Sequence, residues 1–228
     1  GTTTSVPGAD GSDANAYKLS NAGDGQFIST DTGLPSALGS RSYGLWFCQS
    51  SAGANQAMIS WGSGAGTASN ALFIDTNGHI RARTPSGGGV DIIGPHVADG
   101  DWHFAVVVEE NAPFDGVKRR LYVDGVYRVG DATLGSITLA GANRFRIGSW
   151  ADGIGDNYNM FDGIVDAVFV CNYAMGYEEV AELFAKAGQP LGVSPKNPGD
   201  HVEEMSSTDL YCIFDSLSSA DQVDMGVA

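Results

Sequence analysis

The chain has 228 residues, a formal net charge of −15 and no apolar run near the ~18 residues that a membrane-spanning helix needs. This composition excludes membrane insertion, and it leaves no basic stripe that would neutralise nucleic-acid phosphates. The 32 glycines and the 17% share of charged residues are typical of short strands joined by tight turns. We therefore expect one large all-β domain.

Short apolar runs separated by turn residues predict strands along most of the chain. The first is expected in a hairpin, Ala16–Ile28, around a Gly-Asp-Gly turn. Further strands are predicted at Tyr43–Gln49, Ala57–Trp61, Ala71–Asp75, Ile80–Thr84, Trp102–Glu109, Arg144–Ile147 and Ile164–Cys171. Between Arg120–Val123 and Val126–Val129, Asp124-Gly125 predicts a two-residue hairpin turn. In Ile80–Thr84 apolar and basic residues alternate, as they do in a strand with one buried face.

One helix is expected, at Tyr177–Ala187, where Val180, Leu183 and Phe184 share a face at helical spacing. Gly188 follows it and ends it. The domain organisation is then a flexible arm at 1–15, a sandwich at 16–188, a Pro-containing linker at 189–208, and a C-terminal strand and arm at 209–228.

Five segments resemble, in order and spacing, the motifs of laminin-G-like domains in the concanavalin A-like superfamily. They are YGLWFC, DGDWHFAVVVEE, RRLYVDGVYRV, FRIGSW and FDGIVDAVFVCNYAM, which begin at Tyr43, Asp99, Arg119, Phe145 and Phe161. The resemblance implies a two-sheet antiparallel jelly-roll sandwich with one short helix. It covers about 140 residues of the chain.

The strand that opens such domains is missing at the start of the sequence, and a similar run, Leu210–Asp215, stands near its end. A sandwich without that strand has an open sheet edge, which pairs with a strand from elsewhere. The resemblance therefore implies that the tail supplies the strand, either to its own domain or to a neighbouring subunit. The expected assembly residues are Leu210, Tyr211, Cys212, Ile213 and Phe214.

The three cysteines, Cys48, Cys171 and Cys212, all lie in apolar runs. One interpretation is three buried thiols that pack as small hydrophobic side chains. The other follows from the resemblance, which places the first and last strands side by side and so allows Cys171 to pair with Cys212. None of the spacings fits a zinc site.

The resemblance also suggests a structural Ca²⁺ ion, which binds six to eight oxygens. Asp166 stands at the position of a family aspartate and is the first candidate ligand, and Asp215 would reach it if the tail strand docks alongside. Asp24 and Asp31 are further candidates. The alternative is that these residues only shape turns, as Asp and Asn commonly do.

A glycan site is the second candidate, because the long loop after the strand at Arg144–Ile147 carries aromatic and polar residues. Trp150 and Tyr158 would stack on a sugar ring, and Asp156 and Asn157 would bind its hydroxyls. The alternative for Trp150 is that it caps the edge of the sandwich.

Catalysis is not expected. Glu109 and Glu110 are adjacent and point to opposite faces of a strand, so they cannot flank one glycosidic bond. His103 lies in a strand at a structural family position, and no nucleophile, metalloprotease or phosphate-loop motif is present.

The first functional hypothesis is therefore a non-enzymatic structural subunit or repeat of an extracellular or virion surface assembly, joined to copies of itself by β-strand donation. The second is a lectin-like adhesion module that binds surface glycans at a cell or virion surface. Apart from Ca²⁺, no cofactor is expected.

Overall fold

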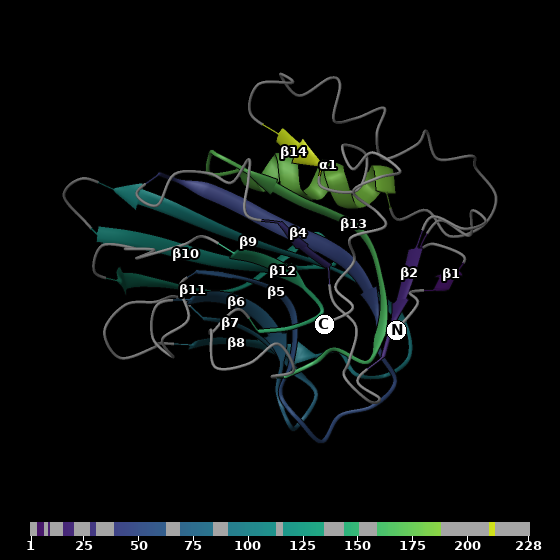
Figure 1. The fold of residues 1–228 in the computed structure, drawn as a ribbon. Coiled ribbons are helices and arrows are strands. Elements are labelled where there is room, and N and C mark those ends of the chain that lie inside the picture. Colours follow the sequence, from purple (N-terminus) through teal and green to yellow (C-terminus); the bar gives the residue numbers. More distant parts are fainter. Residues whose placement is uncertain are drawn as a thin grey trace.

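The computed structural model describes residues 4–6, 9, 16–20, 28–30, 39–62, 69–83, 91–112, 116–134, 144–150, 159–187 and 210–212. Their strands pair antiparallel throughout and form the two layers of a β-sandwich (Figure 1). The two-sheet antiparallel prediction is confirmed.

The eight-stranded sheet runs in the order β1-β2-β13-β4-β9-β10-β11, with β14 also paired to β13. These strands are β1 (Thr4–Val6), β2 (Ala16–Leu19), β13 (Gly163–Cys171), β4 (Arg41–Cys48), β9 (Trp102–Ala112), β10 (Gly116–Val123), β11 (Val126–Leu134) and β14 (Leu210–Cys212). The six-stranded sheet runs in the order β3-β12-β5-β6-β7-β8. Its strands are β3 (Ile28–Thr30), β12 (Arg144–Ile147), β5 (Gln56–Gly62), β6 (Ser69–Ile74), β7 (His79–Arg83) and β8 (Asp91–His96).

The main core lies between the sheets, and alternation along β4 shows how the sequence builds it. Tyr43, Leu45 and Phe47 are fully buried in this inter-sheet core. Trp46 points to the opposite face, where a second apolar cluster forms. Both faces of β4 are covered, and its sequence is accordingly almost continuously apolar from Tyr43 to Cys48.

The helix α1 (Tyr177–Ala187) covers that second face of the eight-stranded sheet (Figure 1). Phe184 of α1 stacks on Trp46, with ring centroids 5.6 Å apart, and Val180 is fully buried. The helix prediction is confirmed, and the Asp124-Gly125 turn is confirmed as well, with φ of 55° and 71°. Glycine is favoured at position 125 for two reasons. Its φ is positive, and a Cβ there would lie 2.8 Å from the Phe184 ring.

Three sequence-based expectations differ from the structure. The Ala16–Ile28 hairpin is wrong: β2 pairs with β13 in one sheet, whereas β3 pairs with β12 in the other. Within the arm expected at 1–15, Thr4–Val6 forms β1 on β2. Strand β8 was not predicted, because its Gly94-Pro95 pair is typical of a loop, yet proline is tolerated on an edge strand such as this.

The C-terminal strand pairs with the chain's own β13, through Phe169↔Cys212, Val170↔Tyr211 and Cys171↔Leu210. Strand β2 pairs with a different part of β13, at residues 163–165. Ile213 and Phe214 lie outside the described residues, as does the whole linker at 189–208. Cys171 is buried and is not in a disulfide, so the Cys171–Cys212 bond is not formed here.

In the part of the chain that the structure describes, no helix is both long enough and apolar enough to span a membrane.

Candidate functional site on the outer face of the six-stranded sheet

The site begins at the turn between β6 and β7, which fixes the carboxylate of Asp75. One oxygen of Asp75 accepts the backbone N–H groups of Asn77, at 2.8 Å, and His79, at 3.0 Å. Burial acts to raise the pKa of Asp75, but these hydrogen bonds and Arg81 outweigh it and lower the pKa below its usual value. The turn therefore orients the Asp75 carboxylate and favours its ionised form.

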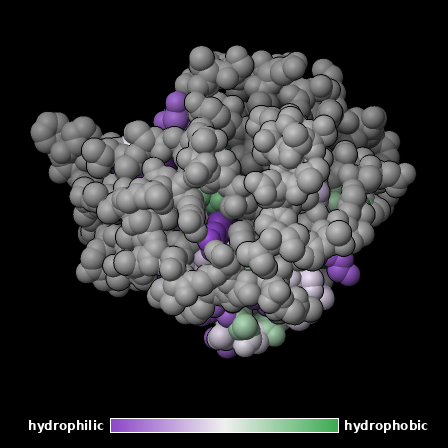
Figure 2. All heavy atoms as spheres, viewed as in Figure 1, coloured by the Kyte–Doolittle hydropathy of each residue, from purple (hydrophilic) through white to green (hydrophobic). Residues whose placement is uncertain are grey.

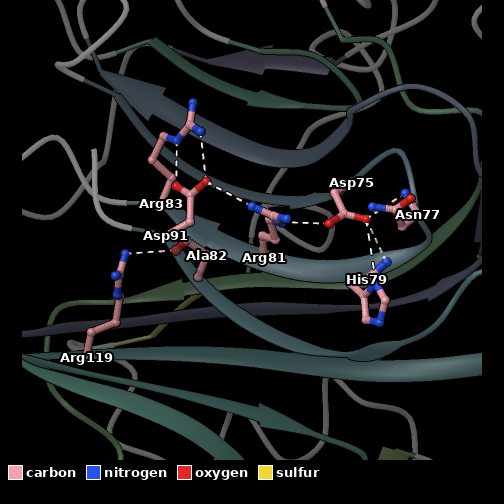
Figure 3. A network of polar contacts seen from close by, with 8 residues as sticks. All are labelled: Asp75, Asn77, His79, Arg81, Ala82, Arg83, Asp91 and Arg119. Carbon is pink, nitrogen blue, oxygen red and sulfur yellow. Dashed lines mark hydrogen bonds and ion pairs between the residues drawn. The ribbon is translucent and has the colours of Figure 1, made fainter. Parts of the chain in front are cut away.

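From this turn, a row of alternating charges crosses β7 and β8 (Figure 3). Arg81 Nε lies 2.7 Å from Asp75 Oδ2, and Arg81 Nη1 lies 3.7 Å from Asp91 Oδ2. Arg83 binds both oxygens of Asp91, through Nε at 2.6 Å and Nη2 at 2.8 Å. The row thus reads Asp75, Arg81, Asp91, Arg83, with two positive and two negative groups.

Strand pairing places these side chains together. Arg83 and Asp91 are direct partners in the β7–β8 ladder, and Arg81 stands two residues before Arg83 on the same face. Behind them, Arg119 of β10 reaches across the sandwich and donates to the carbonyl of Ala82 at 2.9 Å. Figure 3 shows this contact on the opposite side of β7 from the charged row. The row therefore sits on a strand that is held from both sides.

Two aromatic rings lie under Arg83. Its guanidinium carbon is 5.4 Å from the Phe73 ring centroid and 5.2 Å from that of Trp150, and the two rings meet edge to face at 5.2 Å. Both rings are nearly buried, at 2% and 3% exposed. These cation–π contacts orient the guanidinium in addition to the ion pair with Asp91.

The segment that carries Trp150 is fastened to β5 and β12. Gly148 N–H donates to Met58 O at 2.9 Å, and Ser60 Oγ donates to Ser149 O at 2.7 Å. Arg146 Nη1 also donates to Trp150 O at 3.2 Å. The aromatic support of Arg83 is thereby fixed by backbone contacts.

The two arginines of the row are partly exposed to solvent, with side-chain exposures of 33% for Arg83 and 28% for Arg81, whereas Asp91 is 12% and Asp75 only 5% exposed. Ile93, which pairs with Arg81 across the ladder, is 49% exposed. On the molecular face drawn in Figure 2, the described residues that reach the surface are mostly hydrophilic, with hydrophobic residues only in small groups. Polar groups on a rigid sheet can donate and accept hydrogen bonds without rearranging.

The predicted glycan residues meet this site only in part. Trp150 lies beside it, but its ring packs on Phe73 and Arg83 and offers almost no surface for a sugar to stack on. This agrees with the alternative that Trp150 caps the sandwich. Asp156, Asn157 and Tyr158 lie outside the described residues.

Of the predicted calcium ligands, only Asp166 is described. Its two oxygens accept the backbone N–H groups of Ala9, at 3.0 Å, and Ala167, at 2.7 Å. Among the residues that the structure describes, no three His, Cys, Asp or Glu side chains gather as a metal-binding group. Asp24, Asp31 and Asp215 lie outside those ranges, so the Ca²⁺ site stays a prediction.

The residues that were considered for catalysis from the sequence form ion pairs or hydrogen bonds within the domain. Glu109 is fully buried and pairs with Arg41 at 2.7 Å, whereas Glu110 is 41% exposed and pairs with Arg120 at 3.0 Å. The prediction that the two glutamates face opposite sides is confirmed. His103 lies between Asp124 and Asp99, with both ring nitrogens facing carboxylates.

Sequence reasoning did not single out Arg81, Arg83 or Asp91. The available signal was the alternation in Ile80–Thr84, which places both arginines on the face opposite Ile80 and Ala82. Asp91 could not be joined to them, because the strand that carries it was not predicted.

Several solved structures share this fold at low sequence identity. The NanB sialidase from Streptococcus pneumoniae superposes with a TM-score of 0.60 at 17% identity, over 78% of this chain and 28% of the sialidase. A Ruminococcus gnavus IT-sialidase CBM40 bound to α2,3-sialyllactose gives 0.55 at 16% identity, over 67% of this chain and 84% of that domain. Domains LG4-5 of the mouse laminin α1 chain give 0.56 at 14% identity, over 85% of this chain and 49% of the laminin fragment.

The chain thus spans about a quarter of the sialidase and half of the laminin fragment. No curated protein matches it in sequence. The family model described as the concanavalin A-like lectin/glucanases superfamily matches residues 20–181, and the chain belongs to this superfamily as a laminin-G-like β-sandwich domain.

Proposed function

We propose that this domain is a non-catalytic glycan-binding module whose ligand lies on the outer face of the six-stranded sheet. The observation that carries the proposal is the row Asp75, Arg81, Asp91 and Arg83, whose partly exposed arginines are fixed by a buried turn carboxylate and by Asp91 of the paired strand. Membership in a lectin-containing superfamily and the sialyllactose-bound CBM40 among similar structures support the same class of function. An extracellular, cell-surface or virion-surface location fits this class.

The row suits sugar hydroxyls because guanidinium and carboxylate groups stand side by side. A sugar hydroxyl accepts from an N–H group and donates to a carboxylate, so two neighbouring hydroxyls can bind one Arg–Asp pair. Ile93 supplies an exposed apolar surface beside Arg81 for the C–H face of a ring. The proposal does not use Trp150 as a stacking surface, and the loop residues Asp156, Asn157 and Tyr158 remain candidates for further contacts.

The absence of catalysis is part of this proposal. A retaining or inverting glycosidase needs two carboxyl groups that face one bond. In the charged row, Asp75 and Asp91 each form an ion pair with an arginine of the same sheet, so the two carboxylates face their arginines and do not flank a common bond. The described residues of this face therefore support binding and not hydrolysis.

We expect Arg83→Ala to weaken glycan binding about ten- to a hundredfold, because hydrogen bonds to charged groups contribute about 1.5–3 kcal/mol. Arg83→Lys should lose most of the affinity too, since lysine keeps the charge but not the planar fork. Binding to a glycan array, followed by calorimetric titration of the best ligand, measures the effect. Arg128→Ala, an exposed arginine on β11, is the matched control and should bind like the unaltered domain. Equal binding by all variants would refute the site.

A second candidate function is assembly by strand donation, because β14 docks on β13 through only three residue pairs of its own chain. The same three residue pairs formed between two chains would join copies of the domain into an extracellular or virion surface structure. A domain that belongs to such an assembly would act as a structural subunit, with the linker at 189–208 spanning the junction.

Light scattering of the chain with and without residues 209–228 tests this second candidate. An oligomer that forms at rising concentration and depends on the tail supports strand donation. A monomer in both forms contradicts it and leaves the tail as the strand that closes its own sandwich. Circular dichroism of the shortened chain serves as the control, because a folded sandwich makes the comparison valid.

A further inference from the structure

The arrangement of the charged row indicates which glycans it binds, and this inference rests on the proposed glycan site. We infer that the site selects uncharged sugars, because Asp91 occupies the arginine fork that an acidic sugar would need. The class of ligand is thus a neutral glycan with adjacent hydroxyls, and Asp91 is the residue that determines specificity against sialylated or sulfated ones.

The geometry of Arg83 is the first step. A planar guanidinium recognises a carboxylate through two parallel N–H donors. Arg83 already makes this bidentate contact with Asp91, at 2.6 and 2.8 Å. Because Asp91 is the direct partner of Arg83 in the β7–β8 ladder, its carboxylate stays within reach of the guanidinium.

The second step concerns Arg81, which is also held by carboxylates. Its Nε donates to Asp75 at 2.7 Å and its Nη1 lies 3.7 Å from Asp91. Asp75 is held in turn by two backbone N–H groups, and its side chain is only 5% exposed. A ligand carboxylate near Arg81 would therefore face two fixed negative groups.

The charge balance is the third step. The four groups of the row sum to zero, and the whole chain carries a formal charge of −15. The row itself therefore offers an anion no net attraction, and the negative charge of the whole chain opposes its approach. Sugar hydroxyls meet no such barrier, since they form hydrogen bonds to both members of each pair.

The test compares matched glycans: lactose, its sialylated and sulfated derivatives, and other neutral oligosaccharides with their acidic counterparts. The unaltered domain should bind at least one neutral glycan tenfold or more tightly than its acidic derivatives, with little dependence on salt. Tighter or equal binding of the acidic member would overturn the inference while leaving the glycan site in place. Binding of no glycan at all would refute the proposed function itself, and the inference with it.

Asp91→Asn gives the sharper result, because asparagine keeps the size and one acceptor of Asp91 but removes its charge. We expect this variant to gain at least tenfold in affinity for the acidic glycans, and this gained binding should weaken as salt is added. Asp101→Asn removes the same charge from an exposed turn before β9 and should leave the preference unchanged. If Asp91→Asn gains nothing, or if Asp101→Asn gains as much, Asp91 does not set the specificity.

Discussion

Glu109→Ala should lower the free energy of unfolding by about 3–5 kcal/mol, the range seen when one partner of a buried ion pair is removed. Glu109 and Arg41 are both fully buried, and Arg41 Nε lies 2.7 Å from Glu109 Oε2. The same oxygen accepts from Asn70 Nδ2 at 3.3 Å. The alanine variant would leave the Arg41 guanidinium inside the sandwich without its carboxylate. Denaturant unfolding followed by tryptophan fluorescence measures the loss.

The double variant Arg41→Met/Glu109→Leu is the control, because it removes both charges and refills the space. Well-packed apolar replacements of buried ion pairs are commonly neutral or stabilising. We therefore expect the double variant to recover most of the stability that Glu109→Ala loses. A Glu109→Ala domain as stable as the unaltered one would show that the pair is not buried as described. The pairing of these residues across β4 and β9 would then be in question.

His103 should make the stability of the domain fall as the pH rises above about 6.5. Its Nδ1 lies 3.0 Å from Asp124 Oδ2 and its Nε2 lies 3.1 Å from Asp99 Oδ1. The hydrogen bond to Asp124, supported by Asp99, outweighs burial and raises the pKa of His103 above its usual value of about 6.5. Both nitrogens donate only in the protonated ring, so the folded state favours imidazolium.

The raised pKa of His103 determines how the stability changes with pH. The contribution of His103 is fully present below about pH 6.5, the value in the unfolded chain, and is lost as the pH rises through the higher folded value. Asp99 acts in the opposite sense: backbone donation from Asp101 lowers its pKa, so its contribution is lost as the pH falls below about 4. Stability should therefore be highest between about pH 4 and 6.5.

Unfolding curves of the unaltered domain and of His103→Gln, taken at pH 6 and pH 9, measure this effect. At pH 6 the variant should be less stable by about 1.5–3 kcal/mol, the range for hydrogen bonds to charged groups. At pH 9 the difference should shrink. His96→Gln, at an exposed position on β8, should keep the unaltered pH profile. A constant difference between His103→Gln and the unaltered domain across this range would contradict the protonated bridge.

Local signals predicted much of the fold. Asp124-Gly125 defines its own hairpin, because both residues must adopt positive φ. The spacing of Val180 and Phe184 predicts a helix with one buried face, and both side chains pack on the eight-stranded sheet. The pairing partners of short strands carry no such local signal. The Ala16–Ile28 segment therefore looked like a hairpin, although its ends belong to different sheets.

The candidate site shows the same limit more clearly. Alternation alone places Arg81 and Arg83 on one face of a strand. Their partner Asp91 follows a Gly-rich segment and lies on an edge strand that contains Pro95. Only the register of β7 with β8 brings the three together, and register depends on the whole sheet. Trp150 was proposed from the sequence as a sugar-stacking residue or as a cap on the sandwich edge, and its burial follows from packing on Phe73 that the sequence does not show.

The glycan site on the outer face of the six-stranded sheet is tested most directly by locating the bound ligand. A titration of the isotope-labelled domain with its best neutral glycan, followed by amide NMR, reports which residues contact the sugar. We predict that the largest shifts fall on β7 and β8, around Arg81, Arg83, Asp91 and Ile93. Shifts confined to α1, to β14 or to residues 151–158 would contradict this site, even if the glycan binds tightly.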